Sequence, residues 1–160
     1  MPTLFIQRLS QTRITHTSEW IDPGTASMTA LPLMGRVSAG RPLEAIEDPN
    51  WIEVPEQLAQ NAQFALRVRG DSMTEDQIED GDLILIQPRP NVSDGEVVVA
   101  LIDGNEATLK RFFRESNHIR LQPAKTGMAP LRYRLDQVEV IGTVTAIMRV
   151  VTSGQHDLDD

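Results

Sequence analysis

Residues 64–86 of the chain read FALRVRGDSMTEDQIEDGDLILI. Every second residue across 64–68 is apolar, which predicts a strand that stops at Gly70. An acidic turn follows, and the apolar run 83–86 predicts a second strand. Ser72 therefore lies at the corner between a strand and a turn, just beyond a glycine that allows the chain to bend sharply.

A serine at such a corner has two interpretations. It is a common turn or helix N-cap residue, or it is a nucleophile, which needs a base to activate it. The chain has only two lysines, Lys110 and Lys125, and Lys125 lies in a polar segment between Pro123 and Gly127. Lys110 is either a solvated edge lysine or a partly buried one beside Ser72. In the second case burial lowers its pKa, and the neutral amine can act as a base.

The remainder of the chain after residue 64 predicts short strands with little helix. The expected strands are 64–69, 82–87, 95–102, 106–113, 118–123, 132–135 and 138–151. Asp103-Gly104, between two apolar runs, is a hairpin signal. Seven short strands at close intervals are typical of a mainly β protein, either a barrel or a strongly bent sandwich.

The first 63 residues are less regular. Residues 1–30 are polar and rich in turn formers, so we expect a flexible arm without regular secondary structure. Residues 31–42 predict an extended segment that ends at the small pair Ala39-Gly40, either an ordinary edge strand or a segment that a narrow cleft can admit. A short helix is expected around residues 56–59, and Trp51 is expected in the core.

Composition excludes several classes of function. The chain has 160 residues, no cysteine and a formal net charge of −8, so disulfide scaffolds, thiol catalysis and broad attraction to phosphate are not expected. No run of 18 apolar residues and no signal peptide is present, which favours a cytoplasmic protein without membrane contact. The three histidines are far apart and form no metal-ligand pattern.

Three segments together resemble the LexA/UmuD self-cleaving serine peptidases. Val37-Ser38-Ala39-Gly40 resembles the cleavage site, Gly70-Asp71-Ser72-Met73 with Asp80-Gly81-Asp82 resembles the nucleophile box, and Thr108-Leu109-Lys110-Arg111 resembles the lysine box. The segments occur in the same order as in that family, and the resemblance covers residues 31–151.

The resemblance implies a bent β fold of the LexA/signal-peptidase type that forms a homodimer. It implies that Ser72 is the nucleophile, that Lys110 is the general base, and that the backbone N–H groups of Ser72 and Met73 form the oxyanion hole. The bond cut is Ala39–Gly40 of the chain itself, without metal or cofactor. The cut is promoted by a RecA filament on single-stranded DNA during the SOS response.

The biological role has alternatives. Residues 1–30 do not predict a winged helix-turn-helix, so we expect no specific binding of duplex DNA and a UmuD-like role with an error-prone polymerase. The Ala-Gly pair, however, is more similar to LexA than to UmuD, which usually has Cys-Gly. A LexA-type repressor without its DNA-binding domain, and a catalytically silent interaction protein, remain alternatives. The expected division is an arm (1–30), a peptidase domain (31–151) with a cleavage segment (31–42), and an acidic tail (152–160).

Overall fold

The computed structural model describes residues 2–9, 16–22, 24–38, 41–42 and 44–152. Helices are short and strands account for most of these residues, so the expected mainly β fold is confirmed. The elements are β1 (Pro2–Leu9), β2 (His16–Ile21), β3 (Met28–Ser38), β4 (Arg41–Pro42), β5 (Glu44–Pro55), α1 (Glu56–Ala59), β6 (Phe64–Arg69), η1 (Thr74–Asp76), β7 (Leu83–Gln87), β8 (Val97–Ile102), β9 (Glu106–Arg114), β10 (His118–Gln122), β11 (Leu131–Arg134), η2 (Leu135–Gln137) and β12 (Val138–Thr152).

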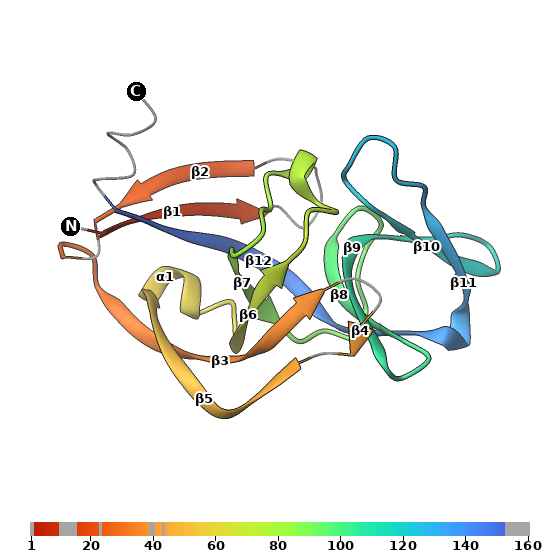
Figure 1. The fold of residues 1–160 in the computed structure, drawn as a ribbon, viewed down its shortest axis with the longest axis horizontal. Coiled ribbons are helices and arrows are strands. Elements are labelled where there is room, and N and C mark those ends of the chain that lie inside the picture. Colours follow the sequence, from red (N-terminus) through yellow and green to blue (C-terminus); the bar gives the residue numbers. More distant parts are fainter. Residues whose placement is uncertain (1, 10–15, 23, 39–40, 43, 153–160) are drawn as a thin grey trace.

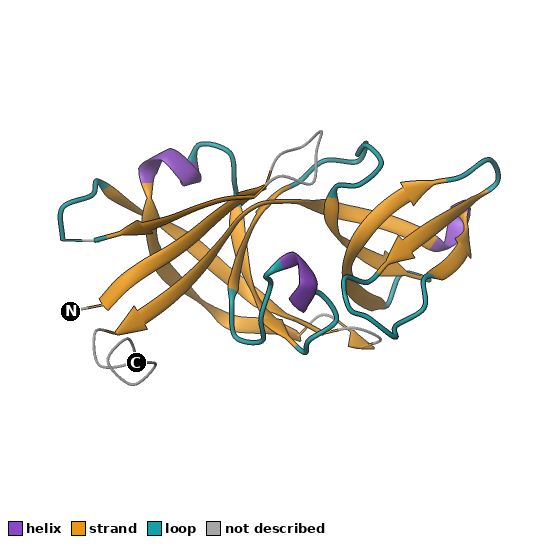
Figure 2. Ribbon diagram, turned by 90° about the horizontal axis from the view of Figure 1, so that it is seen from above, coloured by secondary structure: helices purple, strands orange, loops and turns teal. Residues whose placement is uncertain are grey.

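All strands belong to one mixed sheet. Its main path runs β11-β10-β9-β8-β12-β7-β6-β3-β5, and among the described residues no pairing joins β11 to β5, so the sheet is open rather than a closed barrel. Figure 1 shows β8 to β11 at one end of the molecule and β1, β2, β3 and β5 at the other, with the long β12 running between the two ends. Figure 2 shows the strong twist and bend that separate these ends.

The sheet is buried on both faces near its centre. In β7, Ile84 and Ile86 belong to one apolar cluster with Val68 and Leu109, whereas Leu83 and Leu85 belong to a second. Successive side chains of a strand point to opposite faces, so a strand covered on both faces has a continuous apolar run. This explains why residues 83–86 are apolar without alternation.

Most of the strands expected after residue 64 are present with nearly the predicted bounds. The hairpin at Asp103-Gly104 is also confirmed, because both residues have positive φ (52° and 73°), as a type I′ turn requires. The expected helix is α1, and Pro55 occupies its N-cap position.

Residues 28–38 form an interior strand instead of an edge strand. β3 pairs antiparallel with β5 on one side and parallel with β6 on the other. The expected extended segment is confirmed for residues 31–38, in which Leu33, Gly35 and Val37 are buried and Met34 and Arg36 are exposed.

Two expectations about the first 63 residues are wrong. Within residues 1–30, β1 pairs with both β12 and β2, so an arm without regular structure does not describe these segments. β8 pairs with only the first part of β12, and β1 pairs with the remainder of the same strand. This pairing depends on the tertiary structure, so local sequence does not reveal it. Trp51 is 68% exposed, because the alternation of β5 places Val54 in the core and Trp51 on the opposite face.

Within the part of the chain that the structure describes, no helix has the length and apolar character needed to cross a membrane.

Candidate active site

The loop that carries Ser72 begins where β6 ends. Gly70 has φ of +98°, a conformation that side-chain-bearing residues rarely adopt, and its N–H donates to Asp80 Oδ1 at 2.9 Å. Met73 is 2% exposed and belongs to the central apolar cluster, so it anchors the loop immediately after the serine. Glycine and anchor together place Ser72 at a sharply bent, well-supported corner.

A second loop contacts the loop that carries Ser72. The N–H of Ala124 donates to the carbonyl oxygen of Ser72 at 2.9 Å, and the N–H of Glu75 donates to the carbonyl oxygen of Ala124 at 2.8 Å. Lys125 Nζ contacts Asp71 Oδ2 in an exposed ion pair. In a trans peptide the N–H is directed opposite to the C=O. The Met73 N–H is therefore directed away from Ala124.

Lys110 lies in β9 and is buried, with only 2% of its surface exposed. Its Nζ lies 3.0 Å from Ser72 Oγ, 3.1 Å from Thr108 Oγ1 and 3.1 Å from the carbonyl oxygen of Leu109. Thr108 shares a face with Lys110, because the two residues are two positions apart on one strand. The structure thus brings together Ser72 and Lys110, which are 38 residues apart in sequence.

Burial lowers the pKa of Lys110 from 10.5 to about 8, because an ammonium group loses hydration in an apolar setting. In its charged form, the ammonium can donate to all three neighbouring oxygens. In its neutral form, the amine can donate to Thr108 and Leu109 while its lone pair accepts the proton of Ser72. The arrangement therefore suits proton transfer from Ser72 Oγ to Lys110 Nζ.

A buried ion pair joins the loop of the serine to the strand of the lysine. Arg111 donates from Nε to Asp76 Oδ2 at 2.7 Å and from Nη2 to Asp76 Oδ1 at 2.9 Å. Both side chains are about 90% buried. Asp76 ends η1, four residues after Ser72, and Arg111 follows Lys110 directly, so this bidentate contact connects the two halves of the site.

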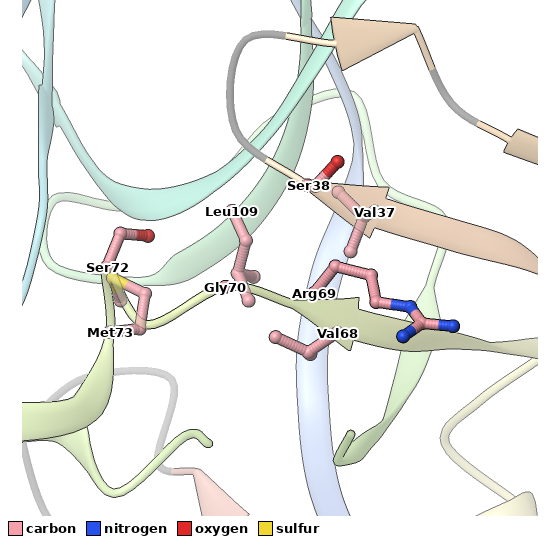
Figure 3. Close-up of a pocket in the computed structure, with 8 residues that line it drawn as sticks. All are labelled: Val37, Ser38, Val68, Arg69, Gly70, Ser72, Met73 and Leu109. Carbon is pink, nitrogen blue, oxygen red and sulfur yellow. The ribbon is translucent and has the colours of Figure 1, made fainter. Parts of the chain in front are cut away.

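The flanks of the expected cleavage site lie beside these groups. Val37 and Ser38 line a narrow cavity together with Gly70, Ser72 and Leu109 (Figure 3). The cavity leaves about 10 Å³ of space, enough for roughly one water molecule.

On the far flank of the expected cleavage site, β4 pairs with β9, the strand that carries Lys110. Ala39 and Gly40 themselves lie outside the described residues. The described residues on either side of this pair are thus bound to the two strands that lead to Ser72 and Lys110.

Sequence reasoning singled out Ser72, Met73, Lys110 and the segment around Ala39, but it missed other contacts. The spacing of Thr108 from Lys110 was a usable signal, since alternate residues of a strand share a face. No local pattern pointed to the ion pair between Asp76 and Arg111. Lys125 lies in a loop, as expected, but the sequence did not show that this loop contacts the loop of Ser72.

The Peptidase S24-like family matches residues 32–145, which contain every group of this site. The chain belongs to this family. Proteins named LexA repressor are similar to this chain. The one from Syntrophobacter fumaroxidans is 46% identical, over 75% of this chain and 58% of its own length. The one from Koribacter versatilis is 41% identical, over 74% of this chain and 57% of its own length. The same name belongs to a relative from Zymomonas mobilis, 42% identical over 74% of this chain and 55% of its own length.

The chain thus matches a little over half the length of these curated relatives. The resemblance to LexA/UmuD-like peptidase domains, first seen in three short motifs, is confirmed over most of the chain.

Proposed function

We propose that the chain is a serine peptidase that cuts its own Ala39–Gly40 bond, with Ser72 as nucleophile and Lys110 as general base. The single observation that carries the proposal is the 3.0 Å contact between Lys110 Nζ and Ser72 Oγ beside a cavity lined by Val37 and Ser38. These two residues directly precede Ala39 in the chain. Attack within one molecule is favoured when nucleophile and bond are held close and correctly oriented, and Val37 and Ser38 bring the chain to the cavity beside Ser72.

The chemistry follows from the protonation state of Lys110. The neutral amine takes the proton of Ser72, and Oγ attacks the carbonyl carbon of Ala39. Negative charge then develops on the Ala39 oxygen, where we propose that the N–H groups of Ser72 and Met73 stabilise it. The protonated lysine returns its proton to the leaving nitrogen of Gly40, and water hydrolyses the acyl-enzyme. No step needs a metal or cofactor.

The proposed setting is the SOS response, with a RecA filament on single-stranded DNA as activator and a homodimer as the working form. Supporting this setting is the similarity to proteins named LexA repressor over most of the chain. The filament would act by binding the arrangement in which the cleavage segment is docked, which shifts the population toward it. The UmuD-like role with an error-prone polymerase and the LexA-type repressor role share this chemistry.

The test is incubation of the purified chain, with and without RecA, single-stranded DNA and nucleotide, followed by denaturing mass spectrometry. We expect two pieces, residues 1–39 and 40–160. Ser72→Ala and Lys110→Ala should each abolish the cut. Lys125→Ala is the matched control: its ion pair is exposed, so the rate should be nearly unchanged. A wild-type chain that stays whole under activation and at alkaline pH would refute the proposal.

A further inference from the structure

We infer that the slot between β5 and β6 is a binding site for the amino-terminal product, so that the cut chain remains a complex of two fragments. The inference rests on the proposed cut after Ala39. That cut places β1, β2 and β3 on one fragment and all later elements on the other. Figure 1 shows β3 between β5 and β6, both of which belong to the second fragment.

The slot binds the backbone of β3 on both sides. The antiparallel pairing with β5 extends from Met28 opposite Pro55 to Arg36 opposite Glu44. The parallel pairing with β6 extends from Leu33 opposite Ala65 to Ser38 opposite Arg69. Departure of β3 would leave the backbone N–H and C=O groups of β5 and β6 that face it unpaired. Unpaired polar groups are unfavourable where they are shielded from water.

The slot also binds side chains of β3. Leu31 (7% exposed) and Leu33 (5%) pack in an apolar cluster whose other members, including Val54 and Leu85, belong to the second fragment. Val37 (1% exposed) packs in the central cluster. Loss of the fragment would expose these side chains and the surfaces that they cover.

The amino-terminal fragment has a second attachment through β1. This strand pairs antiparallel with β12, from Pro2 opposite Thr152 to Arg8 opposite Ala146. Release therefore requires two strands on one short chain to separate at the same time. When one separates, the other keeps it at a high effective concentration near its site.

The ligand of the slot is defined chemically as an extended peptide in which every second residue is apolar and buried, while the residues between them are exposed or partly exposed. Retention has a consequence for the active site, because the retained strand continues to supply Val37 and Ser38 to the cavity beside Ser72. The cleft of the cut protein thus stays lined by its own product.

The experiment uses the full chain after self-cleavage. Denaturing mass spectrometry first establishes that the cut is complete, and the same sample is then studied by non-denaturing size-exclusion chromatography and native mass spectrometry. We expect both fragments in one peak at equal stoichiometry. Elution of residues 40–160 without the amino-terminal fragment would overturn the inference.

Two neighbouring residues of β3 provide a matched pair of variants. Leu33→Ala removes core contacts and should speed dissociation of the fragment by roughly 30-fold or more. This factor corresponds to the binding free energy that is typically lost when a buried leucine is truncated to alanine. Met34→Ala alters a side chain that is 41% exposed on the opposite face and should leave dissociation unchanged. Equal dissociation rates in the two variants would contradict the inference that the slot binds the buried side chains of β3. Circular dichroism of the uncut variants verifies that both fold.

A separate experiment distinguishes failure of this inference from failure of the proposed function. A Ser72→Ala chain with a site-specific protease sequence inserted between Ala39 and Gly40 is cut by the added protease, independently of the proposed chemistry. Co-elution of its fragments supports the slot even if the wild type never cuts itself. Their separation on the column overturns the slot even if self-cleavage is complete.

Discussion

Lys110 is placed where its positive charge is poorly tolerated. The side chain is 2% exposed, and its neighbours at Nζ are two hydroxyl oxygens and a carbonyl oxygen. None of these three acceptors is a carboxylate, and burial alone lowers its pKa to about 8. In the same structure, Val37 and Ser38 lie at the cavity beside Ser72. An exposed lysine, in contrast, would stay charged until about pH 10.

We predict that the rate of unassisted self-cleavage rises with pH and then levels off. With a pKa of about 8, the neutral fraction of Lys110 is about one tenth at pH 7 and about nine tenths at pH 9. Because only the neutral amine accepts the proton of Ser72, the first-order rate should rise several-fold across this range and flatten above it. Mass spectrometry of timed samples measures the rate. A rate that is flat or falls between pH 7 and 9 would exclude Lys110 as the titrating base.

Gly142 allows a close approach of β12 to β7. A Cβ at this position would lie 2.6 Å from the carbonyl oxygen of Gln87 and 2.7 Å from Ile86 Cγ2. We expect Gly142→Ala to lower the free energy of unfolding by about 2 kcal/mol, as overpacking in a core typically does. Urea denaturation measures the change. Glu139→Ala, exposed on the same strand, is the control and should be within about 0.5 kcal/mol of wild type.

Among the elements, β9 and the loop that follows Ser72 are joined by the ion pair of Asp76 and Arg111. Arg111 also donates to the carbonyl oxygen of Gly95. Its guanidinium therefore connects the loop that follows Ser72 with Gly95, which shortly precedes β8, and Arg111 directly follows Lys110 in the chain. We expect this connection to hold Ser72 and Lys110 at a constant distance.

We predict that Asp76→Ala weakens both stability and cleavage. The change leaves a buried guanidinium without its bidentate partner, which typically costs about 3 kcal/mol of stability. Urea denaturation of the Ser72→Ala background measures stability, and the cleavage rate at pH 9 measures positioning when most Lys110 is neutral. Asp76→Glu should recover part of the rate. If Asp76→Ala cleaved as fast as wild type, the ion pair would have no positioning role.

At the scale of the whole molecule, the net charge of −8 opposes binding to nucleic acid. Arginines of the described surface are commonly paired with carboxylates, as Arg149 is with Asp82 and Arg120 with Glu115. Such pairs reduce the positive potential that a phosphate backbone would meet.

We predict that the purified 160-residue chain shows no specific retention of duplex DNA at physiological salt. A gel-shift titration with a defined operator fragment measures this, and the same titration at low salt reports non-specific attraction. Specific retention at physiological salt would contradict the prediction and favour the repressor role over the UmuD-like one. The expected division into residues 1–30, 31–151 and 152–160 stays a prediction, and residues 153–160 lie outside the described part.

Much of the central sheet was predictable from local pattern. The alternation in residues 64–68, the run 83–86 and the Asp103-Gly104 turn each depend on backbone geometry within a few residues, so sequence reports them directly. Three short motifs in order were likewise sufficient to indicate the family and to name Ser72 and Lys110.

Tertiary structure decided the features that depend on which strands are neighbours. The burial of Lys110 follows from cover on both faces of β9, and the pairing of Asp76 with Arg111 joins residues 35 positions apart. The exposure of Trp51 follows from which face of β5 packs on the core, and the interior place of β3 follows from the order of strands in the sheet. Burial and long-range pairing are properties of packed surfaces, and a single strand carries the same side-chain alternation whether its edge is free or paired.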